Sequence, residues 1–117
     1  MHPPARLISI DMDGTLLPNF AQKISERTGR ALRAAQEAGI TVAIATGRRT
    51  AYTVPMLDGL GLRADTPLIT SNGAVTRTLG GEAIDRCHLP APVARGLCGL
   101  LRPFGAVLFT FDRIGRG

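Results

Sequence analysis

Residues 7–15 read LISIDMDGT, and this stretch is the strongest indication of the fold in the sequence. Residues 7–10 are mainly apolar and rich in β-branched side chains, which is typical of a β-strand. The polar string at 11–15 follows at once and predicts a turn at the end of that strand. Carboxylates two positions apart at the end of an extended segment project to the same side. Asp11 and Asp13 can therefore serve one site.

Strand and helix patterns alternate along the next sixty residues. A helical spacing of apolar residues begins after Ser25, a favourable capping residue, and ends before Gly39. The expected elements that follow the first strand are a helix at 25–38, a strand at 41–45, a helix at 50–60 and a strand at 67–70. Short links between alternating strands and helices require right-handed crossovers. The sequence therefore predicts an α/β fold, a Rossmann-like, doubly wound parallel sheet with helices on both faces.

The pattern changes after residue 73. Residues 74–78 and 83–88 flank a Leu-Gly-Gly-Glu turn and predict a hairpin, and a helix from Pro92 to Leu101 and a strand at 106–111 are expected to follow. The last elements are too few to bury a core of their own. We therefore expect two domains, the N-terminal part of one core at 1–82 and the start of an α/β second domain at 83–117.

Composition narrows the functional classes. The 117 residues are 44% hydrophobic and 20% charged, which excludes a disordered tail. The formal charge of +5 comes from basic residues that are spread along the chain, without a run of like charges and without aromatic residues between them. We therefore expect no nucleic-acid partner.

The apolar runs are too short for a membrane span or a signal peptide, so we expect a cytoplasmic protein without membrane contact. Cys87 and Cys98 fit no redox or zinc spacing and are expected to be reduced, partly buried thiols.

Three polar clusters follow the predicted strands, at 11–15, 46–48 and 71–73. In open α/β sheets, ligands bind outside the carboxyl ends of the strands. One carboxylate of the Asp-x-Asp pair could attack phosphorus to give an aspartyl-phosphate, while the other carries protons. A hard cation, Mg²⁺, would neutralise the carboxylates as a phosphate approaches. Thr46 and Gly47 suit a phosphoryl cradle, and Arg48 adds a positive charge.

Residues 8–17 resemble motif I of the haloacid dehalogenase-like (HAD) phosphohydrolases, and residues 44–48 resemble motif II. The helix that ends in Ala-Gly-Ile and the Ser-Asn-Gly-Ala string at 71–74 are similar to the Cof-type subgroup, which carries a large α/β cap. The resemblance implies that Asp11 is the nucleophile, that Asp13 is the general acid and base, and that both hold Mg²⁺. Residues expected to bind phosphate or substrate are Gly14, Thr15, Thr46, Gly47, Arg48 and Asn72. The implied function is a Mg²⁺-dependent phosphatase that acts on sugar phosphates or similar small phosphorylated metabolites.

Alternatives remain beside this hypothesis. The family pattern continues with a motif III cation and a motif IV acidic pair, which no part of residues 1–117 matches. A catalytically inactive truncated fragment or a phosphate-binding remnant is therefore the main alternative. A receiver-type domain is disfavoured, because its acidic pair and its acceptor aspartate lie on different strands. The family's strand order also leaves residues 7–10 as an exposed apolar edge, through which we expect self-association.

Overall fold

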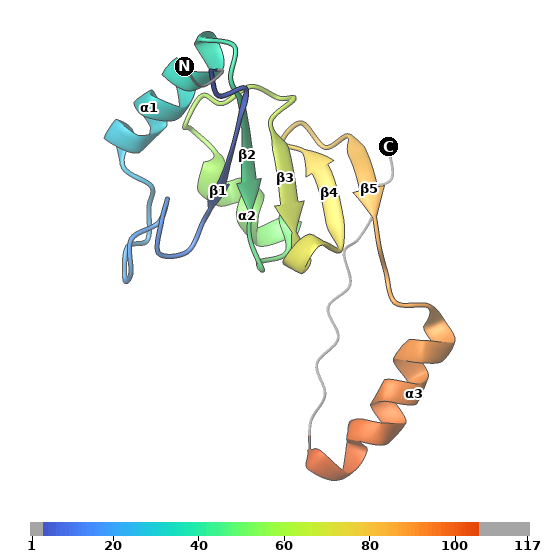
Figure 1. Ribbon diagram of the computed structural model, residues 1–117. Helices are drawn as coiled ribbons and strands as arrows, with labels where there is room; N and C mark the ends of the chain where they lie inside the picture. Colours follow the sequence, from blue (N-terminus) through green and yellow to red (C-terminus); the bar gives the residue numbers. More distant parts are fainter. Residues whose placement is uncertain (1–3, 106–117) are drawn as a thin grey trace.

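Strand β1 (Leu7–Asp11) forms one edge of a five-stranded sheet with the order β1-β2-β3-β4-β5 in the computed structural model, which describes residues 4–105 (Figure 1). The first three strands are parallel, and the last two continue the sheet as an antiparallel hairpin. The bounds of the other strands are β2 (Thr41–Ala45), β3 (Pro67–Thr70), β4 (Val75–Thr78) and β5 (Ala83–Arg86). The strands and hairpin predicted within residues 7–88 are confirmed, and the sheet is mixed.

Helix α1 (Glu26–Glu37) links β1 to β2, and helix α2 (Thr50–Leu57) links β2 to β3. Ser25 caps α1 as the sequence predicts, because its side chain accepts a hydrogen bond from the amide of Thr28 at 3.2 Å. Helix α2 ends three residues earlier than expected. Asp58 has left the helical region at φ −61° and ψ 140°, and Gly59 follows at φ +77°.

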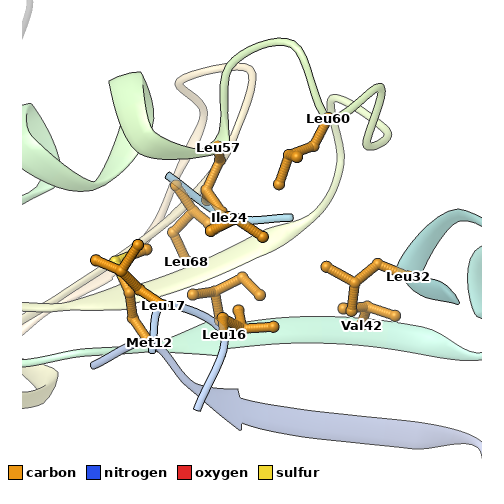
Figure 2. Packing of buried hydrophobic residues seen from close by; sticks show 10 residues of the cluster. Met12, Leu16, Leu17, Ile24, Leu32, Val42, Leu57, Leu60 and Leu68 are labelled. Carbon is orange, nitrogen blue, oxygen red and sulfur yellow. The ribbon is translucent and has the colours of Figure 1, made fainter. Parts of the chain in front are cut away.

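One cluster of buried side chains forms the core of the described residues. It joins Leu32 of α1 and Leu57 of α2 to Val42, Ile44 and Leu68 of the sheet. Figure 2 shows these leucines of the two helices on the same side of β2. Strand residues two apart face the same way, so both helices cover one face of the sheet.

The α/β class and the Rossmann-like parallel strands are thus confirmed, but the expected helices on both faces are not found within residues 4–105. Each crossover from β1 to β2 and from β2 to β3 moves to the next strand in the same direction along the sheet. Right-handed connections that advance in one direction place their helices on one face.

The segment after the hairpin leaves the sheet. Helix α3 (Ala91–Leu101) and the short 3₁₀ turns η1 (Ser71–Gly73) and η2 (Arg102–Phe104) complete the described elements. Figure 1 shows α3 separated from the sheet, and no residue of this helix is buried. Strand β5 pairs with β4, so the sheet continues past residue 82, and the division at 82/83 stays a prediction. The strand expected at 106–111 lies outside the described residues.

Both cysteines are free and exposed, which corrects the expectation of partly buried thiols. Cys87 directly follows the edge strand β5, and Cys98 lies on α3, whose side chains pack against no core among residues 4–105. Within the same residues, none of the helices has the length and apolar character needed to cross a bilayer.

Candidate active site

The register of the parallel strands brings the three predicted clusters to one edge of the sheet. Asp11 pairs with Ala45, and Ala45 pairs with Ile69, so these residues form one row across β1, β2 and β3. The chain leaves the sheet just beyond this row in all three places. The turns at 11–17, 46–48 and 71–73 therefore lie together at the carboxyl end of the sheet, as expected.

The turn after β1 is held by buried side chains. Met12 is completely buried, while Asp11 and Asp13 on either side of it are exposed, which is the alternation predicted from the sequence. The amide of Leu17 donates to the carbonyl of Met12, and the amide of Gly14 donates to the carbonyl of Leu17, both at 2.9 Å. Gly14 has φ +80°, a value that glycine adopts without strain. The buried side chains of this turn thus hold it in a conformation that leaves the carboxylates of Asp11 and Asp13 exposed.

Arg48 binds Asp13 across the site. Its Nη2 lies 2.6 Å from Oδ1 of Asp13, and its Nε lies 2.9 Å from Oδ2, so the guanidinium donates to both carboxylate oxygens. These hydrogen bonds lower the pKa of Asp13 below its ordinary value and raise the pKa of Arg48. Nη1 of Arg48 also lies 3.2 Å from the sulfur of Met56 on α2. Arg48 is therefore fixed from two sides.

Thr46 forms the base of the second turn. It is buried, and its Oγ1 accepts a hydrogen bond from the amide of Arg48 at 3.1 Å. Its own amide donates to the carbonyl of Ile69 on β3 at 2.9 Å. Because a threonine hydroxyl can accept and donate at the same time, the Thr46 hydroxyl retains a proton that it can donate to a ligand.

The third turn lies directly against the second. The amide of Ser71 donates to the carbonyl of Arg48 at 2.9 Å. A Cβ atom built on Gly47 would lie only 2.8 Å from Oδ1 of Asn72. A side chain at position 47 would therefore require the carboxamide of Asn72 to move.

The oxygen donors of Asp11 and Asp13 suit Mg²⁺ in type. Mg²⁺ is commonly bound by one or two carboxylates together with substrate phosphate and water. The described main-chain hydrogen bonds of this turn use the carbonyls of Asp11, Met12 and Leu17, and none uses the carbonyl of Asp13. Among residues 4–105, no group of three or more His, Cys, Asp or Glu side chains is placed to hold a metal ion. The donors thus fit part of a magnesium coordination shell.

Five predicted site residues are joined by direct contacts or hydrogen bonds. They are Asp13, Thr46, Gly47, Arg48 and Asn72. Asp11 is exposed on the same turn as Asp13, and Gly14 and Thr15 shape that turn. Within residues 4–105, Gly14 and Thr15 make no described hydrogen bond to the other two turns. Sequence reasoning missed Met56, whose contact with Arg48 leaves no signal in the sequence.

The fold and the site define an α/β protein with an Asp-x-Asp turn beside a Thr-Gly-Arg turn. The family whose description is haloacid dehalogenase-like hydrolase matches residues 8–113, which is most of the chain. The chain belongs to this family, and its relatives support a member of the Cof type.

Curated relatives and solved structures agree with this assignment. An HMP-PP phosphatase from Shigella flexneri is 43% identical over 91 residues, which cover 77% of this chain and 32% of the relative. A haloacid dehalogenase-like hydrolase from B. subtilis superimposes with a TM-score of 0.75 at 33% identity, covering 85% of this chain and 34% of that one. A HAD subclass IIB sugar phosphatase gives a TM-score of 0.70 at 29% identity, with coverages of 86% and 38%. The chain spans about a third of the length of the relatives it matches.

Proposed function

We propose that the chain carries the nucleophile and acid–base part of a phosphate-monoester hydrolase. The observation that carries this proposal is the placement of Asp11 and Asp13 at the end of β1, beside the Thr46–Arg48 turn at the end of β2. The turn supplies a hydroxyl and a glycine without a side chain next to the carboxylates. This combination suits an incoming phosphoryl group.

The reaction would proceed through a covalent intermediate on Asp11. A carboxylate oxygen of Asp11 attacks phosphorus, the bond from phosphorus to the ester oxygen breaks, and Asp13 gives a proton to the leaving oxygen. Asp13 then takes a proton from the water that attacks the aspartyl-phosphate, which releases phosphate and restores Asp11. Thr46 donates its hydroxyl proton to a phosphoryl oxygen during both steps.

Arg48 links substrate binding to the protonation of Asp13. In the structure its guanidinium holds the pKa of Asp13 below its ordinary value. An entering phosphate competes for the same guanidinium because Arg binds phosphate and carboxylate in the same bidentate way. When Arg48 turns to the phosphate, the pKa of Asp13 rises, and the carboxyl can take up the proton that it later donates.

Mg²⁺ is the proposed cofactor. Asp11 would hold it through its carboxylate and Asp13 through its main-chain carbonyl, in the manner that the family resemblance implies. When bound, the ion supplies positive charge that offsets repulsion between the carboxylates and the phosphate. The residues of this chain then keep the roles described above.

Small phosphorylated metabolites are the proposed substrates. Relatives are named as an HMP-PP phosphatase and a sugar phosphatase, which supports this size and chemistry. The outer edge of β1 is a proposed surface for self-association, since no strand within residues 4–105 pairs with it. Cytoplasmic localisation stays a prediction from the sequence.

A phosphate-binding protein without turnover is the second candidate. The observation in its favour is that Arg48 binds both carboxylate oxygens of Asp13, which withholds the acid and base from the reaction. Such a protein would bind orthophosphate at the Thr46–Arg48 turn without breaking an ester bond.

Hydrolysis of an aryl phosphate by the purified chain, with and without Mg²⁺, tests the proposal. Wild type, Asp11→Asn and Asp85→Asn are compared, because Asp85 is an exposed aspartate on β5, away from the site. We expect Mg²⁺-dependent turnover in wild type and Asp85→Asn and none in Asp11→Asn. Folded but equally inactive proteins that still bind orthophosphate would support the second candidate instead.

A further inference from the structure

The turn after β3 has an unusual backbone. Ser71, Asn72 and Gly73 follow one another in the left-handed region, with φ values of 53°, 55° and 89°. Residues other than glycine rarely adopt this conformation, and Asn tolerates it better than most of them. Two such residues in succession persist only where their surroundings hold them. The contacts of this turn therefore indicate which interaction the strained conformation maintains.

Asn72 lies over the one residue of the neighbouring turn that has no side chain. A Cβ atom on Gly47 would lie 2.8 Å from Oδ1, 3.5 Å from Cγ and 3.6 Å from Nδ2 of Asn72. The first distance is shorter than real Cβ contacts, so the carboxamide occupies the space that a side chain at 47 would need. Asn72 and Gly47 are thus sterically complementary.

Main-chain hydrogen bonds join the same two turns on both sides of this contact. Ser71 donates to the carbonyl of Arg48 at 2.9 Å, and the amide of Asn72 lies 3.4 Å from the carbonyl of Thr46. The 46–48 turn is therefore bonded to the 71–73 turn at both of its ends. Thr46 and Arg48 are the two residues of this turn that would meet the phosphate.

We propose that Asn72 is a positioning residue: its carboxamide lies against Gly47 and fixes the 46–48 turn, and it does not contact the substrate. This proposal is an alternative to the sequence expectation that Asn72 binds substrate, and it rests on the proposed function for its catalytic meaning. The left-handed turn directs the carboxamide of Asn72 toward Gly47. The hydrogen bond from Ser71 to the carbonyl of Arg48 holds the main chain of Arg48, from which the Arg48 side chain reaches Asp13.

Amide hydrogen exchange of the full chain tests the positioning without any need for turnover. Asn72→Gly keeps the left-handed backbone but removes the carboxamide, and Asn72→Asp keeps both the conformation and Oδ1. We expect exchange at the amides of Arg48 and Ser71 to become about tenfold faster in Asn72→Gly, with Val42 and Ile44 of β2 unchanged. Asn72→Asp should restore the slow exchange. Unchanged exchange at Arg48, or an equal increase at every amide, would overturn the proposal.

A double variant tests the steric contact. Gly47→Ala should lower the melting temperature in the wild-type background, because its Cβ meets Asn72, and should have little effect in the Asn72→Gly background. Additive effects would show that the two residues do not touch.

Steady-state kinetics on an aryl phosphate separates positioning from substrate binding. A positioning role predicts that Asn72→Gly lowers kcat, while a higher KM with unchanged kcat would mean that Asn72 binds substrate and would overturn the proposal. A wild-type chain without turnover would contradict the proposed function. The exchange experiment would still decide whether Asn72 positions the 46–48 turn.

Discussion

Arg48 and Asp13 come from the ends of different strands, 35 positions apart, and bind each other through three pairs of atoms. The side chains keep 40% and 50% of their accessible surface. Exposed ion pairs are screened by water and salt, so this pair adds little to the stability of the fold. Its effect is local, because it orients the carboxylate of Asp13 and lowers its pKa.

Replacing Arg48 with Met is expected to raise the pKa of Asp13. The ion pair lowers the pKa of Asp13 below its ordinary value in the folded chain, so the small stabilisation from the pair is present above the unfolded pKa and is lost as the pH falls through the folded one. Carbon-13 NMR titration of the carboxyl groups, without divalent cations, measures the change. Asp65, whose pKa Arg63 lowers, is the control and should not move. Equal Asp13 titrations in both proteins would contradict the ion pair.

Helix α1 shows how one element is adapted to its neighbours. Ser25 caps its first turn, and Glu26 places a negative charge at the positive end of the helix dipole. Gly29 lies inside the helix at an intrinsic cost of about 1 kcal/mol relative to Ala. The structure gives the reason, since a Cβ at this position would come within 3.2 Å of Leu60. The glycine lets the segment after α2 approach α1 closely.

Removal of the Ser25 cap is expected to destabilise the chain. Ser25→Ala leaves the amide of Thr28 without its acceptor and should lower the free energy of unfolding by about 1 kcal/mol, within a range of about 0.5 to 2. Urea denaturation followed by circular dichroism measures this. Gln22→Ala is the control, because Gln22 is also an exposed polar residue but lies in the bend before the helix. Equal losses in both variants would contradict the capping role.

The helices and strands were predictable because the periodicity of apolar residues identifies them. The limits of β2 and β3 and the cap of α1 agree with the sequence, since apolar runs and capping residues are local signals. The end of α2 was wrong because Gly59 and Gly61 both follow it, and the pattern does not say where the helix stops. The face that each helix covers depends on the direction of the crossovers, which no single segment encodes.

The candidate site was predictable as three clusters at strand ends, but its internal contacts were not. Topology alone brings the carboxyl ends of parallel strands to one edge. The binding of Arg48 to Asp13, instead of to solvent or ligand, depends on side-chain conformations that residue spacing does not determine. The fit of Asn72 over Gly47 is a packing relation of the same kind.

At the scale of the molecule, the buried apolar side chains of residues 4–105 are concentrated between the sheet and the first two helices. Helix α1 and helix α2 bury leucines there, whereas every residue of α3 is exposed or half-buried. The two leucines Leu57 and Leu100 differ accordingly, with 1% and 68% of their surface accessible. The same substitution at these positions therefore tests which part of the chain carries the core.

Leu57→Ala is expected to lower the free energy of unfolding by about 2 to 5 kcal/mol, because it removes buried surface and leaves a cavity. Leu100→Ala should change it by less than about 0.5 kcal/mol, as exposed substitutions usually do. Chemical denaturation of both variants measures the difference. A comparable loss in Leu100→Ala would mean that α3 packs against something in solution that the described residues do not show.

The outer edge of β1 also carries exposed apolar side chains. Leu7 is 59% accessible and Ile8 is 36% accessible, and no strand within residues 4–105 pairs with this edge. An unpaired edge offers main-chain donors and acceptors as well as apolar surface to a second strand. This edge therefore supports the proposal that two copies of the chain extend each other's sheet.

Sedimentation velocity over a range of concentrations is expected to show self-association of the chain, and Leu7→Lys is expected to weaken it. Burial of a leucine contributes about 1.5 to 3 kcal/mol, so its loss weakens association by roughly tenfold or more, and a lysine on an edge strand opposes pairing as well. Tyr52→Lys is the control, because Tyr52 is equally exposed at 60% but lies on α2. If Tyr52→Lys weakens association while Leu7→Lys does not, the chains meet through α2 and the edge of β1 stays free.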